Sequence, residues 1–283
     1  MRTLEDALGV PLFDRIKQRL VPTASAATLF TQCAASFEEI ERALAKISGT
    51  ETELSGTVMV GMPIEFGNNL ILPILARFSE KHPQVRFELR LGFASEMNDL
   101  LIRGEADFAF IDDFTVDRRI TTEQVFDEIL DLCAHPDLLK KYGAEPVRDQ
   151  KKYFEKLPYV EYQRGSPVVR MWFAHHLGSR NLEVNAITTV MDVQAIARLV
   201  LLKAGAGILP HHLVSKLREE GNDIHAFRGC GKPVKNEISV AYLKERTHTS
   251  ASKELLNYLR AELKVLTSAT ARALKKSTGA LNS

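Results

Sequence analysis

The spacing of hydrophobic residues between residues 56 and 113 changes several times, and each change predicts a new element. Apolar residues alternate with small or polar ones over 58–60 and again over 85–91, which is typical of strands. Between these stretches, residues 71–78 carry apolar side chains at helical spacing, and a second helical stretch precedes a third strand at 106–111. The pattern therefore predicts the order strand, helix, strand, helix, strand.

Helices that connect successive strands favour parallel pairing, and ligands bind beyond the carboxyl ends of parallel strands. Those ends fall at residues 61–65, at 92–95 and at Asp112 with Asp113. Ser95 is placed to cap the second helix, where its hydroxyl and the first N–H groups can hold a polar ligand group. We expect half of a small-molecule cleft here, with helix capping alone as the alternative role of Ser95.

The middle of the chain repeats this alternation of strands and helices. Two strand patterns, at 158–162 and 182–188, each end in polar residues, and a helix follows the second one at 191–202. Thr188 or Thr189 is expected to cap that helix, which repeats the arrangement expected at Ser95. We therefore predict a second α/β unit with its own polar residues at strand ends.

A long amphipathic helix is predicted from Thr23, its expected N-cap, to Ile47. Its apolar residues are spaced alternately three and four apart, like the a and d positions of coiled coils. They are Phe30, Cys33, Phe37, Ile40, Leu44 and Ile47. A polar linker follows at 48–53. Two interpretations stay open: the seam pairs with a helix of a second copy, or it packs against the chain's own domain.

The residues before this helix carry three cations at alternate positions, Arg15, Lys17 and Arg19. In an extended hairpin, alternate residues project from one face, so the cations would form a row suited to DNA phosphates. The alternative is an ordinary solvated surface hairpin. Residues 1–8 have the pattern of the last turns of a helix, which Gly9 is expected to end.

At 283 residues the chain is longer than most single domains, so two or three compact units are expected. A net charge of +1 gives no overall attraction to nucleic acid or to acidic membranes, so such contacts must come from local patches. The three cysteines are too scattered for a disulfide framework or a zinc site, and they fit a reducing cytoplasm. The sequence shows neither a signal-peptide pattern nor an apolar run of membrane-spanning length.

Searches for catalytic and cofactor motifs favour a protein that is not an enzyme. The glycines at 205–207 and 229–231 lack the spacing of dinucleotide and phosphate loops. The histidine pairs at 175–176 and 211–212 have no acidic residue at metal-ligand spacing. We therefore predict no catalytic residue, no metal and no cofactor.

Two groups of residues occur along the chain in an order that, taken together, is specific enough to indicate a protein family. The first group is Leu4-Glu5, Leu8-Gly9, Leu12-Phe13, Arg15, Arg19 and Thr23. The second is Pro73, Phe78, Pro83 and Val85, then Gly104, Asp107 and Phe108, then Gly205, Gly207, Ile208, Leu209 and Pro210. In this order they resemble LysR-type transcriptional regulators over nearly the whole chain, although the family's first helix-turn-helix residues have no counterpart before Met1.

The resemblance implies an α/β fold with two Rossmann-like subdomains of periplasmic-binding-protein type, preceded by a partial winged helix-turn-helix and a long linker helix. The implied boundaries are 1–22 for the remnant of the winged helix-turn-helix, 23–53 for the dimerising linker helix and hinge, 54–127 with 228–267 for subdomain I, 128–227 for subdomain II, and 268–283 for a flexible tail.

By resemblance, the chain is a cytoplasmic regulator that binds a small-molecule effector between the subdomains. It would also bind itself, as a homodimer or homotetramer, and DNA if its helix-turn-helix is completed upstream. The implied effector contacts are Pro63, Ile64, Glu65, Ser95, Asp112, Gln163, Arg164, Thr188, Thr189 and Gly207, and the implied DNA contacts are Arg2, Arg15, Lys17 and Arg19. Because Glu65 and Asp112 are acidic, we expect an effector with a cationic or hydroxyl group besides an acceptor group.

Two other functions compete with this interpretation. A cytoplasmic solute-binding or sensor protein without DNA binding would share the two-lobed fold, but it would need neither the basic hairpin nor the heptad helix. A small-molecule enzyme on the same fold would carry dispersed catalytic residues that no motif reveals.

Overall fold

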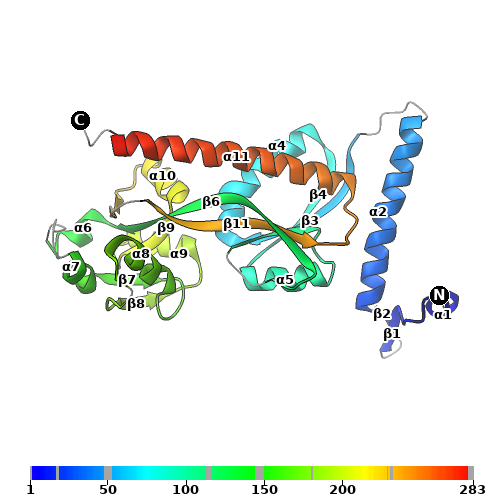
Figure 1. Ribbon diagram of the computed structural model, residues 1–283, viewed down its shortest axis with the longest axis horizontal. Helices are drawn as coiled ribbons and strands as arrows, with labels where there is room; N and C mark the ends of the chain where they lie inside the picture. Colours follow the sequence, from blue (N-terminus) through cyan, green and yellow to red (C-terminus); the bar gives the residue numbers. More distant parts are fainter. Residues whose placement is uncertain are drawn as a thin grey trace. The chain divides into compact units, whose positions relative to one another are not determined.

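The computed structural model describes residues 2–279, apart from 17–18, 48–52, 113–115, 144–149, 180, 228 and 230–231. The chain divides into two compact units. Unit 1 comprises Met1–Phe126 and Ile238–Ser283, and unit 2 comprises Asp127–Glu237. Two strands, β6 (Ile120–Ala134) and β11 (Val234–Leu243), pass from one unit into the other (Figure 1).

The N-terminal part of unit 1 forms the elements that the sequence predicts. They are α1 (Arg2–Leu8), β1 (Phe13–Ile16), β2 (Arg19–Pro22) and α2 (Ala24–Ile47). Gly9 ends α1 with a φ of 68°, a conformation that glycine adopts without strain. Thr23 caps α2, because its Oγ1 accepts a hydrogen bond from the Ala26 N–H at 3.2 Å. The predicted helix from Thr23 to Ile47 is thus confirmed.

The centre of unit 1 is a parallel arrangement of three strands. β3 (Ser55–Pro63) pairs in parallel with both β4 (Gln84–Gly92) and β5 (Phe108–Asp112), while β11 runs antiparallel to β5. The connections between them contain α3 (Ile64–Phe66), the π-helical turn η1 (Gly67–Ile71), α4 (Leu72–Lys81) and α5 (Ala94–Ile102). This order confirms the predicted strand, helix, strand, helix, strand pattern.

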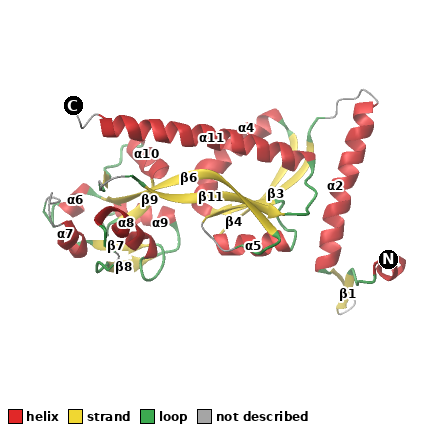
Figure 2. Cartoon of the chain, viewed as in Figure 1, coloured by secondary structure: helices red, strands yellow, loops and turns green. Residues whose placement is uncertain are grey.

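Helices lie beside the sheet of unit 1 (Figure 2), and the residues of its hydrophobic core come from both. α11 (Ser250–Gly279) contacts β3 and α4, and it buries Leu255, Leu259 and Leu263. Phe78 of α4 and Phe108 of β5 are also fully buried in this cluster. Burying each such side chain stabilises the fold by about 1.5–3 kcal/mol relative to exposure. This explains why the apolar residues of α4 and α11 recur at helical spacing.

Unit 2 contains a two-stranded parallel sheet and antiparallel pairs on β6. β7 (Pro158–Glu161) pairs in parallel with β8 (Asn185–Thr189), and β6 pairs with β9 (Gly207–Pro210) and β10 (His225–Ala226). Its helices are α6 (Pro136–Leu139), α7 (Gln150–Lys156), α8 (Pro167–Leu177), α9 (Val193–Leu201) and α10 (His211–Glu219). Trp172, the single tryptophan of the chain, is buried in its core beside Phe154 and Phe173.

The C-terminal segment differs from the prediction. Residues 268–283 are expected to form a flexible tail, but α11 continues to Gly279. Ala, Leu and Lys are strong helix formers, and no glycine or proline interrupts the segment before Gly279, so local propensity favours the longer helix. Among the described helices, none combines the length and the apolar character that crossing a bilayer requires.

Candidate functional site

The carboxyl ends of the parallel strands form one edge of the sheet in unit 1. In the register of β3 and β4, Pro63 lies opposite Gly92, and β5 also runs parallel to β3. The predicted contacts 63–65, Ser95 and Asp112 therefore all follow this edge. The structure brings these residues together as the strand order predicts, and the same edge binds ligands in other parallel sheets.

Glu65 is a buried carboxylate at this edge, with 7% of its surface exposed. Glu65 lies in the short helix α3, which begins directly after Pro63. Asn69, one turn further on, donates its Nδ2–H to Glu65 Oε1 at 2.9 Å. This hydrogen bond fixes one carboxylate oxygen, while Pro63 and Ile64 beside it are half-buried.

Ser95 is not the cap of α5, which corrects the prediction. Phe93 is the N-cap in extended backbone, and Ser95 is an exposed residue of the first turn. Glu96 accepts the Phe93 N–H at 3.0 Å through its side chain, and this bond places the helix start at Ala94. The Glu96 carboxylate lies close to Gly92, so a Cβ at that position would displace the Glu96 side chain from its hydrogen bond with the Phe93 N–H.

Asp112 ends β5 and is half-buried opposite Ile238 of β11. Its neighbour Asp113 lies outside the described residues.

In unit 2 the structure reveals a buried carboxylate, Glu161, that sequence patterns do not single out. Glu161 ends β7, opposite Thr189 at the end of β8, and only 5% of its surface is exposed. Thr189 donates its hydroxyl to Glu161 Oε1 at 2.7 Å, and Ser166 donates its hydroxyl to Glu161 Oε2. The available signal was an acidic residue directly after the apolar run 158–160 and before a glycine turn.

Neither Thr188 nor Thr189 caps α9, so this prediction is wrong. The N-cap is Asp192, whose carboxylate accepts the N–H groups of Gln194 at 3.0 Å and Ala195 at 3.3 Å. Because β8 extends to Thr189, the threonines belong to the strand end, and aspartate is a strong N-cap at the next available position.

The remaining predicted contacts in unit 2 have different surroundings. Gln163 and Arg164 are exposed in the turn after β7. Gly207 is buried in β9, where a Cβ would lie 2.6 Å from Ile196 Cγ2 of α9. Close packing of β9 on α9 therefore explains this glycine without a ligand.

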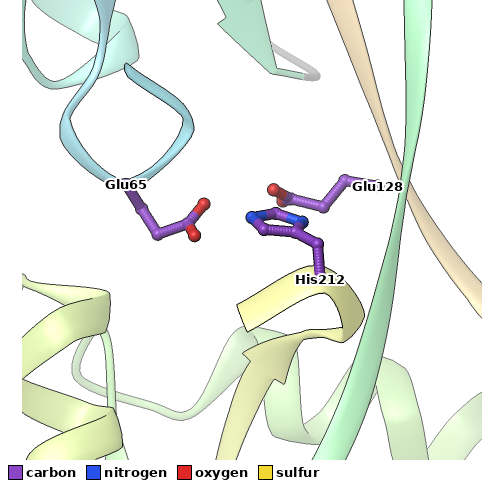
Figure 3. Close-up of side chains that lie close together, drawn as sticks. All are labelled: Glu65, Glu128 and His212. Carbon is purple, nitrogen blue, oxygen red and sulfur yellow. The ribbon is translucent and has the colours of Figure 1, made fainter. Parts of the chain in front are cut away.

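A second acidic group of unit 2 lies on β6. Glu128 is 6% exposed and accepts the Asn236 Nδ2–H at 3.1 Å. Figure 3 shows its carboxylate beside the imidazole of His212, at the start of α10, and the nearest ligand atoms of the two lie within 4.8 Å. Glu65, also labelled in Figure 3, belongs to unit 1.

The N-terminal hairpin corrects the predicted row of cations. β1 and β2 pair so that Arg15 lies opposite Leu20 and Arg19 lies opposite Ile16. Partners across a ladder share a face and neighbours alternate, so Arg15 and Arg19 occupy positions on opposite faces. This register follows from the interval of only two residues between the paired strand ends, and Lys17 itself lies outside the described residues. Arg2 is the first residue of α1.

α2 presents two different surfaces on opposite sides. Every residue of the predicted seam is exposed: Phe30 75%, Phe37 66%, Ile40 54%, Leu44 59% and Ile47 83%, together with Cys33.

The other side of α2 contacts the C-terminal part of unit 1. Gln32 Oε1 accepts the Thr247 N–H at 3.2 Å, Glu39 forms an ion pair with Lys253 at 2.8 Å, and Ala35 is 1% exposed. At about 100° per residue, these three α2 residues centre roughly 140° away from the seam. The seam therefore does not pack against the chain's own domain.

Taken together, these observations define a class of protein: two α/β units with polar strand ends, preceded by a hairpin and a helix with an exposed heptad seam. Residues 51–264 match the family model described as the LysR substrate binding domain. This match covers most of the chain, so the chain belongs to the LysR family and is a LysR-type transcriptional regulator.

Individual relatives agree with this assignment. The chain is 25% identical over 248 residues to an HTH-type transcriptional regulator of Haemophilus influenzae, covering 86% of this chain and 82% of that protein. Its fold is similar to ArgP from Mycobacterium tuberculosis, with a TM-score of 0.67, 13% identity, and coverage of 93% of this chain and 85% of ArgP. It is also similar to full-length CbnR in complex with its target DNA, with a TM-score of 0.58, 22% identity, and coverage of 93% and 88%.

Proposed function

We propose that this LysR-type regulator dimerises through α2, contacts DNA through its N-terminal elements and responds to a small-molecule effector. Under this proposal it works in the cytoplasm and catalyses no reaction. CbnR, which shares the fold, is bound to its target DNA, and this supports the DNA-binding part of the proposal. The dimer is the basic assembly, and two dimers can form a tetramer.

The exposed seam of α2 is the observation that carries the proposal. Six apolar residues at heptad spacing face away from the contacts that α2 makes with the rest of unit 1. Exposed apolar stripes of this kind mark protein interfaces, and the heptad spacing fits a second helix. A second copy of α2 supplies that helix, and the hairpin before α2 is thereby duplicated in one particle.

Effector contacts are proposed at the carboxyl ends of the parallel strands within each unit. Those of unit 1 are Pro63, Ile64, Glu65, Ser95 and Asp112, and those of unit 2 are Gln163, Arg164, Thr188 and Thr189. Gly207, at the start of the antiparallel strand β9, is proposed as a further contact in unit 2. The burial of Glu65 and the hydrogen bond between Thr189 and Glu161 support these two residues in particular.

DNA contact by the N-terminal elements is tested by salt titration. Replacing Arg15, Lys17 and Arg19 with glutamine removes three cations that neutralise DNA phosphates in this proposal. Each neutralised phosphate releases counterions, so the slope of log affinity against log salt should fall by about 0.9 for each phosphate that the variant leaves unneutralised. Fluorescence anisotropy with a labelled random duplex at several salt concentrations measures this slope.

A matched variant controls for the change in net charge. Arg86, Arg90 and Lys264 are exposed residues of unit 1 outside the hairpin, and their replacement with glutamine removes the same charge. This control should keep the wild-type slope. Equal slopes for all three proteins would remove the hairpin from the DNA interface.

A further inference from the structure

The carboxylate of Glu161 carries a charge that the described part of the chain leaves unneutralised. Its two described partners, Ser166 and Thr189, are neutral hydroxyls. Among the residues that the structure describes, no lysine, arginine or histidine forms an ion pair with it. Arg164, three residues further on, is exposed in the turn. A buried carboxylate is costly unless a cation compensates it, so the compensating charge has to come from elsewhere.

We propose that Glu161 binds the cationic group of the effector, an ammonium or a guanidinium. This inference rests on the proposed function and adds the chemical class of the ligand. Glu161 ends the parallel strand β7, and Thr189 ends its neighbour β8, which is the edge where parallel sheets bind ligands.

The two hydroxyls leave room for a cation. Thr189 occupies one lone pair of Oε1, and Ser166 occupies one lone pair of Oε2. A carboxylate offers about four acceptor positions, so one position on each oxygen stays available. Two such positions on one carboxylate match the parallel N–H groups of a guanidinium or a single ammonium.

The backbone conformation at Ser166 directs its hydroxyl to the Glu161 carboxylate. Ser166 precedes α8, yet it has a left-handed φ of 54° and its hydroxyl does not cap the helix. That hydroxyl points to Glu161 instead. Non-glycine residues in this conformation cost free energy and concentrate at binding sites, where they orient a side chain. Ser166 thus fixes the carboxylate in position at the expense of the helix cap.

Glu161 could instead have only a structural role, in which its hydrogen bonds connect the turn after β7 to the end of β8. The two roles predict different effects of replacing Glu161. Glutamine at position 161 keeps an acceptor for one hydroxyl and a similar shape but removes the charge. If Glu161 is only structural, Glu161→Gln should keep most of the stability of unit 2. If Glu161 binds a cation, the same substitution should remove the preference for cationic ligands.

The experiment uses the full chain and ligands matched in shape. Thermal unfolding is followed by the fluorescence of Trp172, which is buried in unit 2. The panel pairs agmatine with N-carbamoylputrescine, cadaverine with 1,5-pentanediol and putrescine with 1,4-butanediol, so that only one member of each pair carries the tested cationic group, and adds succinate and glutarate as anions. Hits are then titrated by calorimetry against wild type, Glu161→Gln and Thr189→Val.

A member with the tested cationic group should bind the wild type at least about ten-fold more tightly than its partner without that group, the worth of one hydrogen bond to a charged group. Glu161→Gln should abolish this preference, and Thr189→Val should weaken binding of the cation while the preference persists. Equal binding of the two members of a pair, wild-type affinity in Glu161→Gln, or stabilisation by no cationic member would overturn the inference. Binding of an anion or a neutral compound alone would overturn it too, yet leave the proposed effector function standing, and the DNA titration tests that function separately.

Discussion

His248 is a half-buried histidine in the polar cluster that precedes α11. Its Nδ1 lies 3.3 Å from the Ser252 hydroxyl, and its ring contacts Tyr242. Close by, Arg246 and Asp107 form a buried ion pair at 2.7 Å. Burial lowers the pKa of His248 below its ordinary value, while the Asp107 charge acts in the opposite direction and Arg246 reinforces the lowering. His248 is therefore neutral in the folded protein near neutral pH.

This environment makes the stability of unit 1 depend on pH in a definite direction. The unfolded chain takes up a proton at His248 near pH 6.5, whereas the folded chain does so only at lower pH. The unfolded state then binds more protons, so the stabilisation is complete above about pH 6.5 and declines as the pH falls toward the folded pKa.

Urea unfolding between pH 8 and pH 5 should show this decline in the wild type and a smaller one in His248→Gln. Other titrating groups are common to both proteins, so the difference isolates His248. A pH profile of the variant parallel to that of the wild type would contradict the assignment.

At the residue scale, the sequence predicts positions better than partners. It places Thr188 and Thr189 at the end of a strand and Ser95 at the start of a helix, but it wrongly assigns them to helix caps, because several nearby residues compete for each cap. Phe93, together with Glu96, caps α5, and Asp192 caps α9. Which of the nearby residues forms each cap depends on the backbone geometry at the helix start, and only the three-dimensional structure shows that geometry. The burial of Glu161 is hidden for the same reason, since a charged residue at a strand end usually faces water.

At the scale of elements, α2 is the part of the molecule with the clearest separation of roles. The polar contacts of Gln32 and Glu39 attach it to the C-terminal part of unit 1, while the heptad seam lies on the opposite side. The spacing of apolar residues predicts the seam directly, but it cannot tell a partner helix from the chain's own domain. The exposure of the seam shows that it does not pack against unit 1, and this supports the proposed pairing with a partner helix.

A charge within the seam should separate the dimer. Phe37→Glu places an unpaired carboxylate at the centre of an apolar interface, where burial costs several kcal/mol. Ala43→Glu adds the same charge at an exposed position of α2 off the seam. Sedimentation velocity should show a monomer for Phe37→Glu and a wild-type dimer for Ala43→Glu. A dimer that persists in Phe37→Glu would remove α2 from the interface.

At the scale of the whole molecule, the pairing of the strands can be predicted from the helices that connect them, but the lengths of the helices cannot. Helical connections between apolar strands predict the parallel pairing of β3 with β4 and β5. The same rule leads to the pairing of β7 with β8. The length of α11 is not predicted because serine and threonine, which favour a helix less, are interspersed with the strong helix formers of residues 268–279.

The proposed response to an effector requires that effector binding and DNA binding are coupled in this chain. Two ligands of one protein that share a conformational equilibrium change each other's affinity by the same factor, about 5- to 150-fold for common coupling energies. The most direct measurement is the affinity of the full chain for a duplex selected from random DNA. It is made with and without the small molecule that stabilises the chain in the thermal unfolding experiment. The DNA affinity should change by a factor within that range, and the affinity for the small molecule should change by the same factor when DNA is present. A small molecule that binds with high affinity and leaves the DNA affinity unchanged would contradict the proposed coupling.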